Sequence, residues 1–472
     1  MRNLLILLSV ASLAGSGCSS DDSSGSSSDG STSSTSDDTT GSDATGGDTS
    51  GGDTTGGDTT GGDTTGGDTT GGDTTGGDTG TTGVADCPEN TGQRPPAISE
   101  HFGVFDPVKE RVIFHGGNPA FPVECFGKNA YESTTWAYWP RCGVWEQVAT
   151  AGEGPGPRGR ATAIYDEGHH AMVIFGGRFR ATGADGTSPY TMYGDTWWLD
   201  LSTDTWSKVE TKGTAPSPRI LSSAIYDPEG ERMLLFGGST ANTGLNFFPQ
   251  NDVWELDLGN DTWTQLAVNG AAPTARQYHG AIYDPIAHAL VVTGGGDANA
   301  FFGPFFGDTW SLDLGTMAWT QLHAGTQAAP DRRIWGRTVY APGLDRMVLF
   351  GGHDDGSLGN RNDMWMFDLR NKQWELVGLG DTINNVVAAG QCDLPADFAT
   401  IEEGTPERRS AHLFVYWPAE GSLLIHGGKT DCGLIDDVWQ LDVQSYEWTN
   451  HEPASIGEAC ERYSETCQGH CG

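Results

Sequence analysis

The stretches SAIYDPEGERMLLFGG (residues 223–238) and NDVWELDLGNDTW (residues 251–263) form one unit of a repeat that organises most of this chain. The first stretch holds two short apolar runs, of which one ends in Tyr-Asp-Pro and the other in a glycine pair. The second stretch carries Trp254 and, nine residues further on, Trp263. Short apolar runs separated by Gly, Pro and Asp are typical of β-strands joined by tight turns. The unit is therefore predicted to contain four strands, a to d, with a tryptophan in each of the last two.

The same unit occurs six times along the chain. Its glycine pairs are Gly116-Gly117, Gly176-Gly177, Gly237-Gly238, Gly294-Gly295, Gly351-Gly352 and Gly427-Gly428. Its tryptophan pairs are Trp136 and Trp145, Trp197 and Trp206, Trp254 and Trp263, Trp310 and Trp319, Trp365 and Trp374, and Trp439 and Trp448. A sheet of this kind cannot bury both of its faces alone, so neighbouring copies must stack. Six stacked sheets that close on themselves form a β-propeller.

This combination of a glycine pair with spaced tyrosine and tryptophan closely resembles the kelch family, over about residues 98–449. The resemblance implies an all-β chain, a six-bladed kelch-type β-propeller of four-stranded antiparallel blades, similar to the central domain of galactose oxidase. We place the propeller at residues 87–450. The first copy departs most from the pattern, because Trp139 stands where the others have Asp and Thr134 opens its strand c. An insertion at residues 376–407 lacks a glycine pair and is not counted as a seventh blade.

The N-terminus resembles a bacterial lipoprotein signal. Arg2 is followed by an apolar stretch from Leu4 to Leu13, then by small residues and then by Cys18. The apolar stretch is too short to span a bilayer as a permanent helix. Residues 1–18 are therefore expected to be a signal peptide ending at Cys18, the lipidated residue, and cleavage by an ordinary signal peptidase is the alternative. We expect the protein in the cell envelope, lipid-anchored and facing outside the cytoplasm at the outer membrane or cell surface, or alternatively secreted.

Residues 19–86 are rich in Gly, Asp, Thr and Ser and contain a repeated Gly-Gly-Asp-Thr-Thr sequence with almost nothing apolar to bury. We predict a disordered linker there, and a Cys-rich tail at residues 451–472. The chain has 63 acidic and 26 basic residues, for a net charge of −37. This acidity disfavours nucleic acid as a partner, since phosphate binding needs clustered Lys and Arg. Membrane contact is expected only through the N-terminal lipid.

One face of the propeller is predicted to carry the function. Connections in a four-stranded meander alternate between the two faces, so the b–c loops and the d–a linkers share one face, and all the variation in length lies there. Five repeats place an arginine seven residues before the tyrosine of strand a. These arginines are Arg158, Arg219, Arg276, Arg333 and Arg409, and the first repeat has Ile98 instead. Three residues further along stand His101, His279 and His412.

Because strand a is innermost in a propeller, these side chains are expected to ring the mouth of the central channel. Guanidinium groups offer forked donors to carboxylate, sulfate or phosphate groups, so we assign the five arginines, with His279 and His412, as candidate ligand-binding residues. Relatives of this fold that bind acidic peptides use arginines near this place. The alternative is that the arginines pair with loop carboxylates and lock neighbouring blades together.

The b–c loops also carry aromatic residues. They are Phe179, Tyr190 and Tyr193 in the second repeat, Phe247 and Phe248 in the third, and Phe301, Phe302, Phe305 and Phe306 in the fourth. Exposed aromatic clusters mark surfaces that bind proteins or sugars. The six phenylalanines of the third and fourth repeats are therefore further candidate ligand-binding residues. The alternative is that these loops fold over and pack on one another.

Eight cysteines remain when Cys18 is set aside: Cys87, Cys125, Cys142, Cys392, Cys432, Cys460, Cys467 and Cys471. An even number in an exported chain predicts disulfides. The repeats begin with strand a and end with strand d, so no swapped strand fastens the last blade to the first. We expect Cys87 to pair with Cys460, Cys467 or Cys471 as a clasp, and Cys392 to pair with Cys432. A zinc site made by the tail cysteines and His470 is the lesser alternative.

Motifs of enzymes are weak in this chain, which lacks His-Glu-x-x-His, Gly-x-Ser-x-Gly and a phosphate loop, and we assign no catalytic residue, metal or cofactor. The leading hypothesis is a surface-tethered module that binds an anionic or carbohydrate-bearing partner, a protein or a carbohydrate, over the b–c loop face. The alternative is a secreted oxidase or sugar-modifying enzyme. Galactose oxidase uses copper with tyrosine and histidine ligands and a cross-linked cysteine, and here Tyr278, His279 and His412 are expected near the channel mouth.

Overall fold

The computed structural model describes residues 87–120, 130–181, 189–241, 247–299, 303, 305–354, 359–384, 399–431 and 433–455. The chain divides into two units, Met1–Val84 and Ala85–Gly472, and every described residue belongs to the second. The predictions for the signal peptide, the linker and most of the C-terminal tail therefore lie outside the described residues. Along the stretches that are described, no helix is long and apolar enough to cross a membrane.

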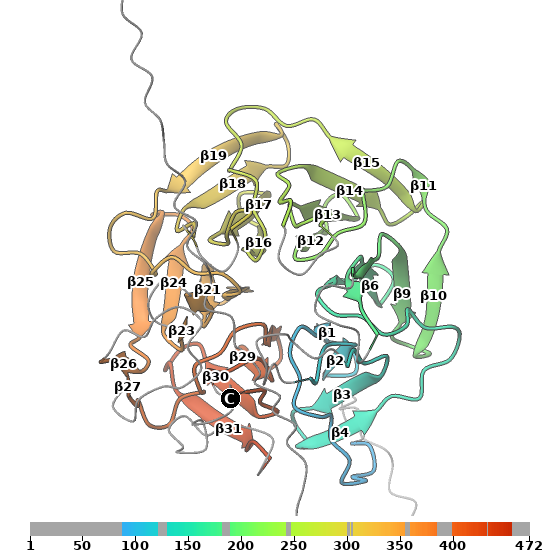
Figure 1. Ribbon diagram of the computed structural model, residues 1–472, viewed down its shortest axis with the longest axis vertical. Helices are drawn as coiled ribbons and strands as arrows, with labels where there is room; N and C mark the ends of the chain where they lie inside the picture. Colours follow the sequence, from blue (N-terminus) through green and yellow to red (C-terminus); the bar gives the residue numbers. More distant parts are fainter. Residues whose placement is uncertain are drawn as a thin grey trace, which may run out of the picture. The chain divides into compact units, whose positions relative to one another are not determined.

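Six antiparallel blades surround a central axis, which confirms the predicted six-bladed propeller (Figure 1). The innermost strands, a, are β1 (Phe102–Asp106), β5 (Thr162–Asp166), β12 (Ser223–Asp227), β16 (Gly280–Asp284), β20 (Arg337–Ala341) and β28 (Leu413–Trp417). Strands b are β2 (Arg111–His115), β6 (Ala171–Phe175), β13 (Arg232–Phe236), β17 (Ala289–Thr293), β21 (Arg346–Phe350) and β29 (Ser422–His426). Strands c are β3 (Thr135–Trp139), β9 (Thr196–Asp200), β14 (Val253–Asp257), β18 (Thr309–Asp313), β24 (Met364–Asp368) and β30 (Val438–Asp442). The outermost strands, d, are β4 (Val144–Gln147), β10 (Thr205–Val209), β15 (Thr262–Leu266), β19 (Ala318–His323), β25 (Gln373–Gly378) and β31 (Trp448–Glu452).

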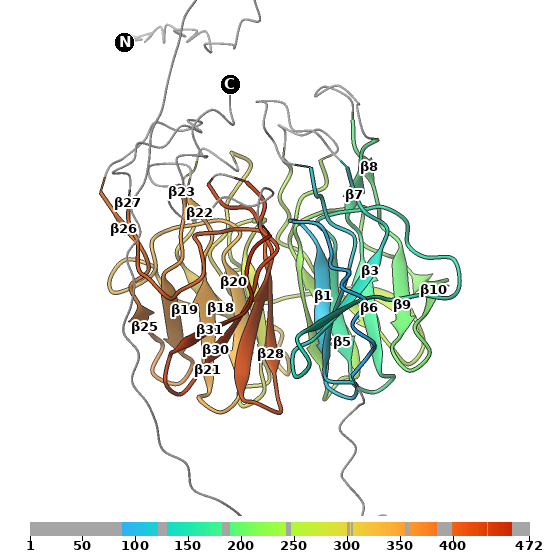
Figure 2. The same ribbon diagram turned by 90° about the horizontal axis from the view of Figure 1, so that it is seen from below.

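Short extra strands extend the connections between these elements. They are β7 (Arg178–Phe179) and β8 (Thr191–Met192), β11 (Lys212–Gly213), β22 (His353–Asp354) and β23 (Gly359–Asn360), and β26 (Thr382–Ile383) and β27 (Ala399–Thr400). The pairs β7–β8, β22–β23 and β26–β27 lie toward one end of the propeller, and the short turns lie at the other (Figure 2). We call the first end the loop face and the second the turn face.

Blade three shows how the repeat unit folds. Strands β12 and β13 pair from Ser223 opposite Phe236 to Asp227 opposite Arg232. The Asp227 carboxylate accepts a hydrogen bond from the N–H of Glu229 at 3.1 Å, and this Asx contact stabilises the turn that follows strand a. The Tyr-Asp-Pro sequence therefore ends strand a and the glycine pair follows strand b, as predicted. Strand b is buried along nearly its whole length, because both of its faces contact neighbouring blades.

The tryptophans fill the space between blades, as expected. A separate apolar cluster occupies each of the six blade–blade interfaces, including the one between blade six and blade one. Trp206 of strand d donates its indole N–H to Thr135 of the preceding blade at 3.2 Å, and Trp263 donates in the same way to Thr196 at 3.2 Å. Both indoles are about 98–99% buried, so they bury a large apolar surface while satisfying their polar atom.

The glycine pairs are required by a close approach between blades. At Gly238, where φ is 85°, the N–H donates to the carbonyl of Arg276 in the next blade at 2.9 Å. A Cβ at this position would come within 2.2 Å of the Ser222 hydroxyl and 2.6 Å of the Ile220 carbonyl in the same blade. A Cβ at Gly237, where φ is 62°, would come within 2.8 Å of the Arg276 carbonyl in the next blade. Only glycine fits this conformation and this space, so the pair marks the point where each blade joins the next.

The ring closes without a shared strand, as predicted from the order of the repeats. The N–H of Gly428 in blade six donates to the carbonyl of Ile98 in front of blade one at 2.8 Å, repeating the contact between other neighbouring blades. The segment before Ile98 adds an ion pair between Arg94 and Asp436 at 3.2 Å. Apolar side chains of blades one and six pack in a common cluster. Non-covalent contacts therefore hold the seam between the first and the last blade.

The prediction that Cys87 pairs with a cysteine of the C-terminal tail is wrong. Cys87 is bonded to Cys142, with their Cα atoms 5.9 Å apart, and not to a tail cysteine. Cys142 follows strand c of blade one, in the turn to strand d, so the disulfide fastens the leading segment to the first blade instead of bridging the seam. The order of the strands predicts that Cys142 lies in the turn between strands c and d of blade one. It does not predict that the segment before blade one brings Cys87 next to this turn. The other predicted pair, Cys392 with Cys432, lies outside the described residues, as do Cys18, Cys125, Cys460, Cys467 and Cys471.

Candidate functional site

The five repeated arginines are buried inside the blades, with relative exposures of 0–3%. Each pairs with the aspartate that stands just before strand c of its own blade. The pairs are Arg158–Asp195 (2.7 Å), Arg219–Asp252 (2.7 Å), Arg276–Asp308 (2.8 Å), Arg333–Asp363 (2.5 Å) and Arg409–Asp437 (2.5 Å). The same aspartates also accept the indole N–H of the first tryptophan, at 2.6–2.8 Å. One carboxylate thus joins the start of strand a to strand c.

A third contact completes this arrangement. Each arginine donates to the carbonyl of the first glycine of the pair in its own blade, at 3.0–3.1 Å. Blade one has neither partner: Ile98 replaces the arginine, and Thr134 replaces the aspartate and accepts the Trp136 indole at 3.2 Å. Arginine and aspartate are therefore present together or absent together. This burial corrects the expectation that the arginines face a ligand at the mouth. Their role is structural, but each ion pair ties together parts of one blade and does not lock two neighbouring blades, as the alternative expected.

The histidines three residues further along also pack between blades. The His279 ring contacts Phe236 of the preceding blade, with centroids 5.2 Å apart, and a Cβ on Gly237 would come within 3.1 Å of its Cε1 atom. His412 packs in the same way on Phe350, at 5.7 Å, and its Cε1 atom is equally close to the Cβ position of Gly351. Burial lowers the pKa of His279 to about 3 and moves the pKa of His412 well below its usual value. Both rings line the central cavity as buried, neutral groups.

The loop phenylalanines fall into three groups. Phe247 and Phe305 are buried at 4% and 5% exposure, and Phe306 lies 4.6 Å from the Arg276 guanidinium, measured to its ring centroid. Phe248 is 62% exposed. Phe301 and Phe302 lie outside the described residues. The two expectations for these loops therefore both hold in part, because most described rings pack inward while one points to solvent.

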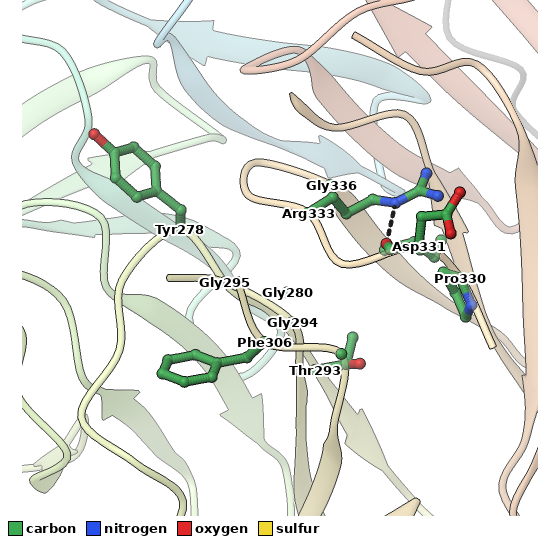
Figure 3. A pocket seen from close by; sticks show the side chains of 12 residues that line it. Tyr278, Gly280, Thr293, Gly294, Gly295, Phe306, Pro330, Asp331, Arg333 and Gly336 are labelled. Atoms are coloured by element: carbon green, nitrogen blue, oxygen red, sulfur yellow. Dashed lines mark hydrogen bonds between the residues drawn. The ribbon is translucent and has the colours of Figure 1, made fainter. Parts of the chain in front are cut away.

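A small crevice opens beside Phe306, between blades four and five (Figure 3). It contains about 310 Å³ of empty space, and glycines 280, 294, 295 and 336 supply much of its wall. Arg333 lies along one side, where its Nε donates to the carbonyl of Asp331 at 2.9 Å. The far end of this arginine pairs with Asp363, so its charge already has a partner within the blade.

The sequence did not predict a ring of residues that lies at the channel mouth. This ring is formed by the residues two positions after each arginine, and after Ile98 in blade one. We call this set the axial plug: Glu100, Arg160, Leu221, Tyr278, Trp335 and Ala411. All six are left-handed, with φ between 53° and 61°. Their backbones are linked from blade to blade, since the N–H groups of Glu100, Arg160, Leu221, Tyr278 and Trp335 donate to the carbonyls of Ala411, Glu100, Arg160, Leu221 and Tyr278 at 3.0–3.3 Å.

Side chains of the axial plug cross the axis and fill the mouth. Arg160 of blade two pairs with Glu100 of blade one at 2.6 Å and donates to the Tyr278 hydroxyl of blade four at 3.0 Å. Its guanidinium also lies 4.8 Å from the Trp335 ring of blade five. The Tyr278 and Trp335 rings meet edge to face with centroids 4.4 Å apart. The Arg160 side chain is 7% exposed and the other five residues are at most 9% exposed, so these residues close the loop-face end of the channel.

Cations and aromatic rings of blade two pack beside the axial plug. The Arg178 and Arg180 guanidinium groups lie 3.8 Å and 4.3 Å from the Tyr190 ring centroid. Arg178 also donates to the Tyr131 hydroxyl at 3.0 Å. These stacked cation–π contacts hold the β7–β8 extension on the loop face. Tyr193 contacts one of the repeated arginines instead, because the Arg158 guanidinium lies 3.9 Å from its ring centroid.

Within the part of the chain that the structure describes, no three His, Cys, Asp or Glu side chains are grouped to hold a metal ion. The residues that the oxidase alternative singles out are placed otherwise. Tyr278 belongs to the axial plug and accepts a hydrogen bond from Arg160, while the His279 and His412 rings pack between blades. No observation on the described residues specifically favours the oxidase alternative.

Known proteins resemble this chain in sequence and in fold. Residues 170–386 match the family described as KLHDC2/KLHL20/DRC7 Kelch-repeats domain. The chain is 25% identical over 287 residues to the leucine-zipper-like transcriptional regulator 1 homolog of Drosophila melanogaster, covering 60% of this chain and 25% of that protein. It is 25% identical over 294 residues to Kelch domain-containing protein 10 of Rattus norvegicus, covering 61% of this chain and 63% of that protein. The chain thus spans less than two thirds of either relative's length.

The solved structure of YjhT has the same fold. It matches with a TM-score of 0.54 and 15% sequence identity, covering 76% of this chain and 98% of YjhT. At this identity the likeness shows the fold alone. Together with the six blades, their glycine pairs and their paired tryptophans, these similarities show that the chain carries a kelch-repeat domain folded as a six-bladed β-propeller.

Proposed function

We propose that this propeller is a protein-interaction module that binds its partner over the loop face, close to Phe248. Kelch propellers generally bind other proteins, which supports a binding role of this class. The axial plug fills the mouth of the channel, so the loop face presents a continuous surface there without an opening. A partner would therefore lie across the face instead of entering the axis from that side.

The observation that carries this proposal is an exposed aromatic ring on a fixed backbone. The Phe248 side chain is 62% exposed, yet its N–H donates to the Ser239 hydroxyl at 3.0 Å and its carbonyl accepts the N–H of Thr240 at 3.2 Å. The preceding residue, Phe247, is buried against Tyr278 of the axial plug, with centroids 5.9 Å apart. Because these two bonds already hold the Phe248 backbone, little conformational entropy of this residue is lost when a partner covers the ring. Rigid aromatic side chains are enriched among residues that dominate binding energy.

Replacing Phe248 by aspartate is expected to weaken partner capture at least tenfold, since it removes the apolar contact and places a charge in the interface. The measurement is affinity capture from the native host with the full chain as bait, quantified by mass spectrometry for each variant. The matched control is Ile286→Asp, because Ile286 is 65% exposed in an a–b turn on the turn face. Equal capture by the wild type and F248D, or selective loss in I286D, would contradict the proposal. A glycan array tests the alternative that the ligand is a carbohydrate. In that case the wild type would bind a sugar on the array and F248D would not.

We also propose that the chain is held at a membrane through a lipid on Cys18, with residues 19–86 as the tether. The apolar stretch before Cys18 and the polar Gly-Gly-Asp-Thr-Thr repeat after it support this proposal. In the native host, C18A is expected to move the protein from the membrane fraction to the soluble fraction and to abolish incorporation of radiolabelled palmitate. S19A serves as the control and keeps both properties. Labelling of C18A at the wild-type level would rule out this anchor.

A further inference from the structure

The central cavity of the propeller is polar and contains no acidic side chain among its described lining residues. It has about 670 Å³ of empty space, including solvent at its open end, and the beginnings of all six innermost strands line it. Its polar side chains are the hydroxyls of Thr162, Ser222, Ser223 and Thr338, the rings of His101, His279 and His412, and Arg337. The strands also turn their free edges inward, since each is the innermost of its sheet. In a chain with 63 acidic residues, a cavity without a carboxylate stands out.

Arg337 is the charged group of this cavity. It begins β20, and its Nε donates to the carbonyl of His412 in the next blade at 2.8 Å. The five repeated arginines each have an aspartate partner, but no described carboxylate lies within 4.0 Å of the Arg337 guanidinium. Burial lowers the pKa of Arg337 to about 10, and no acidic group is present to oppose that effect. A partly buried cation without a counterion is costly unless an anion accompanies it.

The repeat itself does not require an arginine at this position. The residues in the same place in blades one, two, three, four and six are Phe102, Thr162, Ser223, Gly280 and Leu413. Ser223 makes the bond that Arg337 makes, because its hydroxyl donates to the carbonyl of His279 in the next blade at 2.7 Å. A serine is thus sufficient for this tie between blades. What Arg337 adds is a positive charge and two further nitrogens that have no ion-pair partner in the described residues.

We propose that the central cavity binds a small oxyanion, a molecule with a carboxylate or phosphate group, on the guanidinium of Arg337. The forked N–H groups of arginine match the geometry of both kinds of anion. The axial plug closes the loop-face end of the channel, so the ligand enters from the turn face. The site is therefore separate from the protein-binding surface around Phe248, and neither function depends on the other.

The test is isothermal titration calorimetry of the full chain with sodium phosphate, sodium sulfate and sodium lactate at constant ionic strength set by sodium chloride. The wild type is expected to bind at least one of these anions, and R337S to bind it at least tenfold more weakly, as expected for loss of charge-assisted hydrogen bonds. R337S is chosen because Ser223 already makes the inter-blade tie in blade three. R337K is expected to retain partial binding, since it keeps the charge but loses the fork.

Two controls make the result specific. R332Q removes one positive charge from an exposed arginine five positions earlier in the same blade and is expected to leave binding unchanged. Preference for phosphate or for lactate decides between a phosphate-bearing and a carboxylate-bearing ligand. Equal affinities of the wild type and R337S, or the absence of heat with every anion in the wild type, would overturn the site. Failure of F248D to lose its protein partner would leave this inference untouched.

Discussion

Replacing Arg409 by alanine is expected to lower the free energy of unfolding by about 3–5 kcal/mol, because it leaves the Asp437 carboxylate buried without its cation. The side chains of this pair are 0% and 5% exposed, the most buried of the five repeated pairs. Arg409 also donates to the carbonyl of Gly427, and its own carbonyl accepts the N–H of Gly352 in the preceding blade. Loss of the side chain therefore weakens the join between strand a and the b–c loop as well as the charge balance. Urea denaturation followed by tryptophan fluorescence measures the change.

Blade one supplies the compensating variant. The double substitution R409I with D437T reproduces its Ile98 and Thr134, and Trp439 would then donate to threonine as Trp136 does to Thr134 at 3.2 Å. Because a buried ion pair replaced as a whole by apolar or neutral groups costs little, the double variant is expected to regain more than half of the lost stability. R141A, at an ion pair whose arginine is 37% exposed, is the control and should cost less than about 1 kcal/mol. Losses of equal size for R409A and R141A would contradict the structural role of the pair.

Acidification from pH 7 to pH 5 is expected to destabilise the protein by several kcal/mol. Burial lowers the pKa of His101 and of His279 to about 3, whereas an unfolded histidine titrates near pH 6.5. Below pH 6.5 the unfolded chain binds protons that the folded chain does not, so stability is complete above that pH and falls as the pH approaches 3. At pH 5 each such histidine costs about 2 kcal/mol. Burial raises the pKa of Glu407 and Asp431, which acts in the opposite direction.

Histidines outnumber these carboxyls among the described residues. Burial lowers the pKa of His101, His115, His279, His353, His412 and His426. Urea denaturation at pH 7, 6 and 5 measures the net effect. H279S introduces the serine that blade three has at the equivalent position, Ser222. This variant should lose about 2 kcal/mol less unfolding free energy than the wild type between pH 7 and pH 5. S222A, a substitution at the equivalent site that changes no titratable group, should keep the wild-type slope. Stability that is the same at pH 7 and pH 5 would show that these histidines do not titrate in this way.

The repeat pattern predicts the positions of the repeated arginines along the chain, but it does not predict which residues they contact. The spacing of the repeated arginines places all five at one position in the segment that leads into strand a. Their partners stand 28–37 residues further along the chain, and nothing in the local sequence joins an arginine to an aspartate at that distance. One signal was present, since the first repeat lacks both the arginine and the aspartate. Arg337 could not be predicted from the repeat, because the other five blades have no arginine at its position.

The sequence by itself determined the six blades, the order of their strands and the boundaries of most strands. These features follow from short-range patterns, because a Tyr-Asp-Pro turn, a glycine pair and two tryptophans each act over a few residues. Only the tertiary structure decided where the charged and aromatic side chains point. Glu100, Arg160, Leu221, Tyr278, Trp335 and Ala411 share no chemistry, and their left-handed backbone is imposed by hydrogen bonds between blades. Likewise, Cys87 pairs with Cys142 because the leading segment passes the first blade, a path that depends on packing and not on spacing.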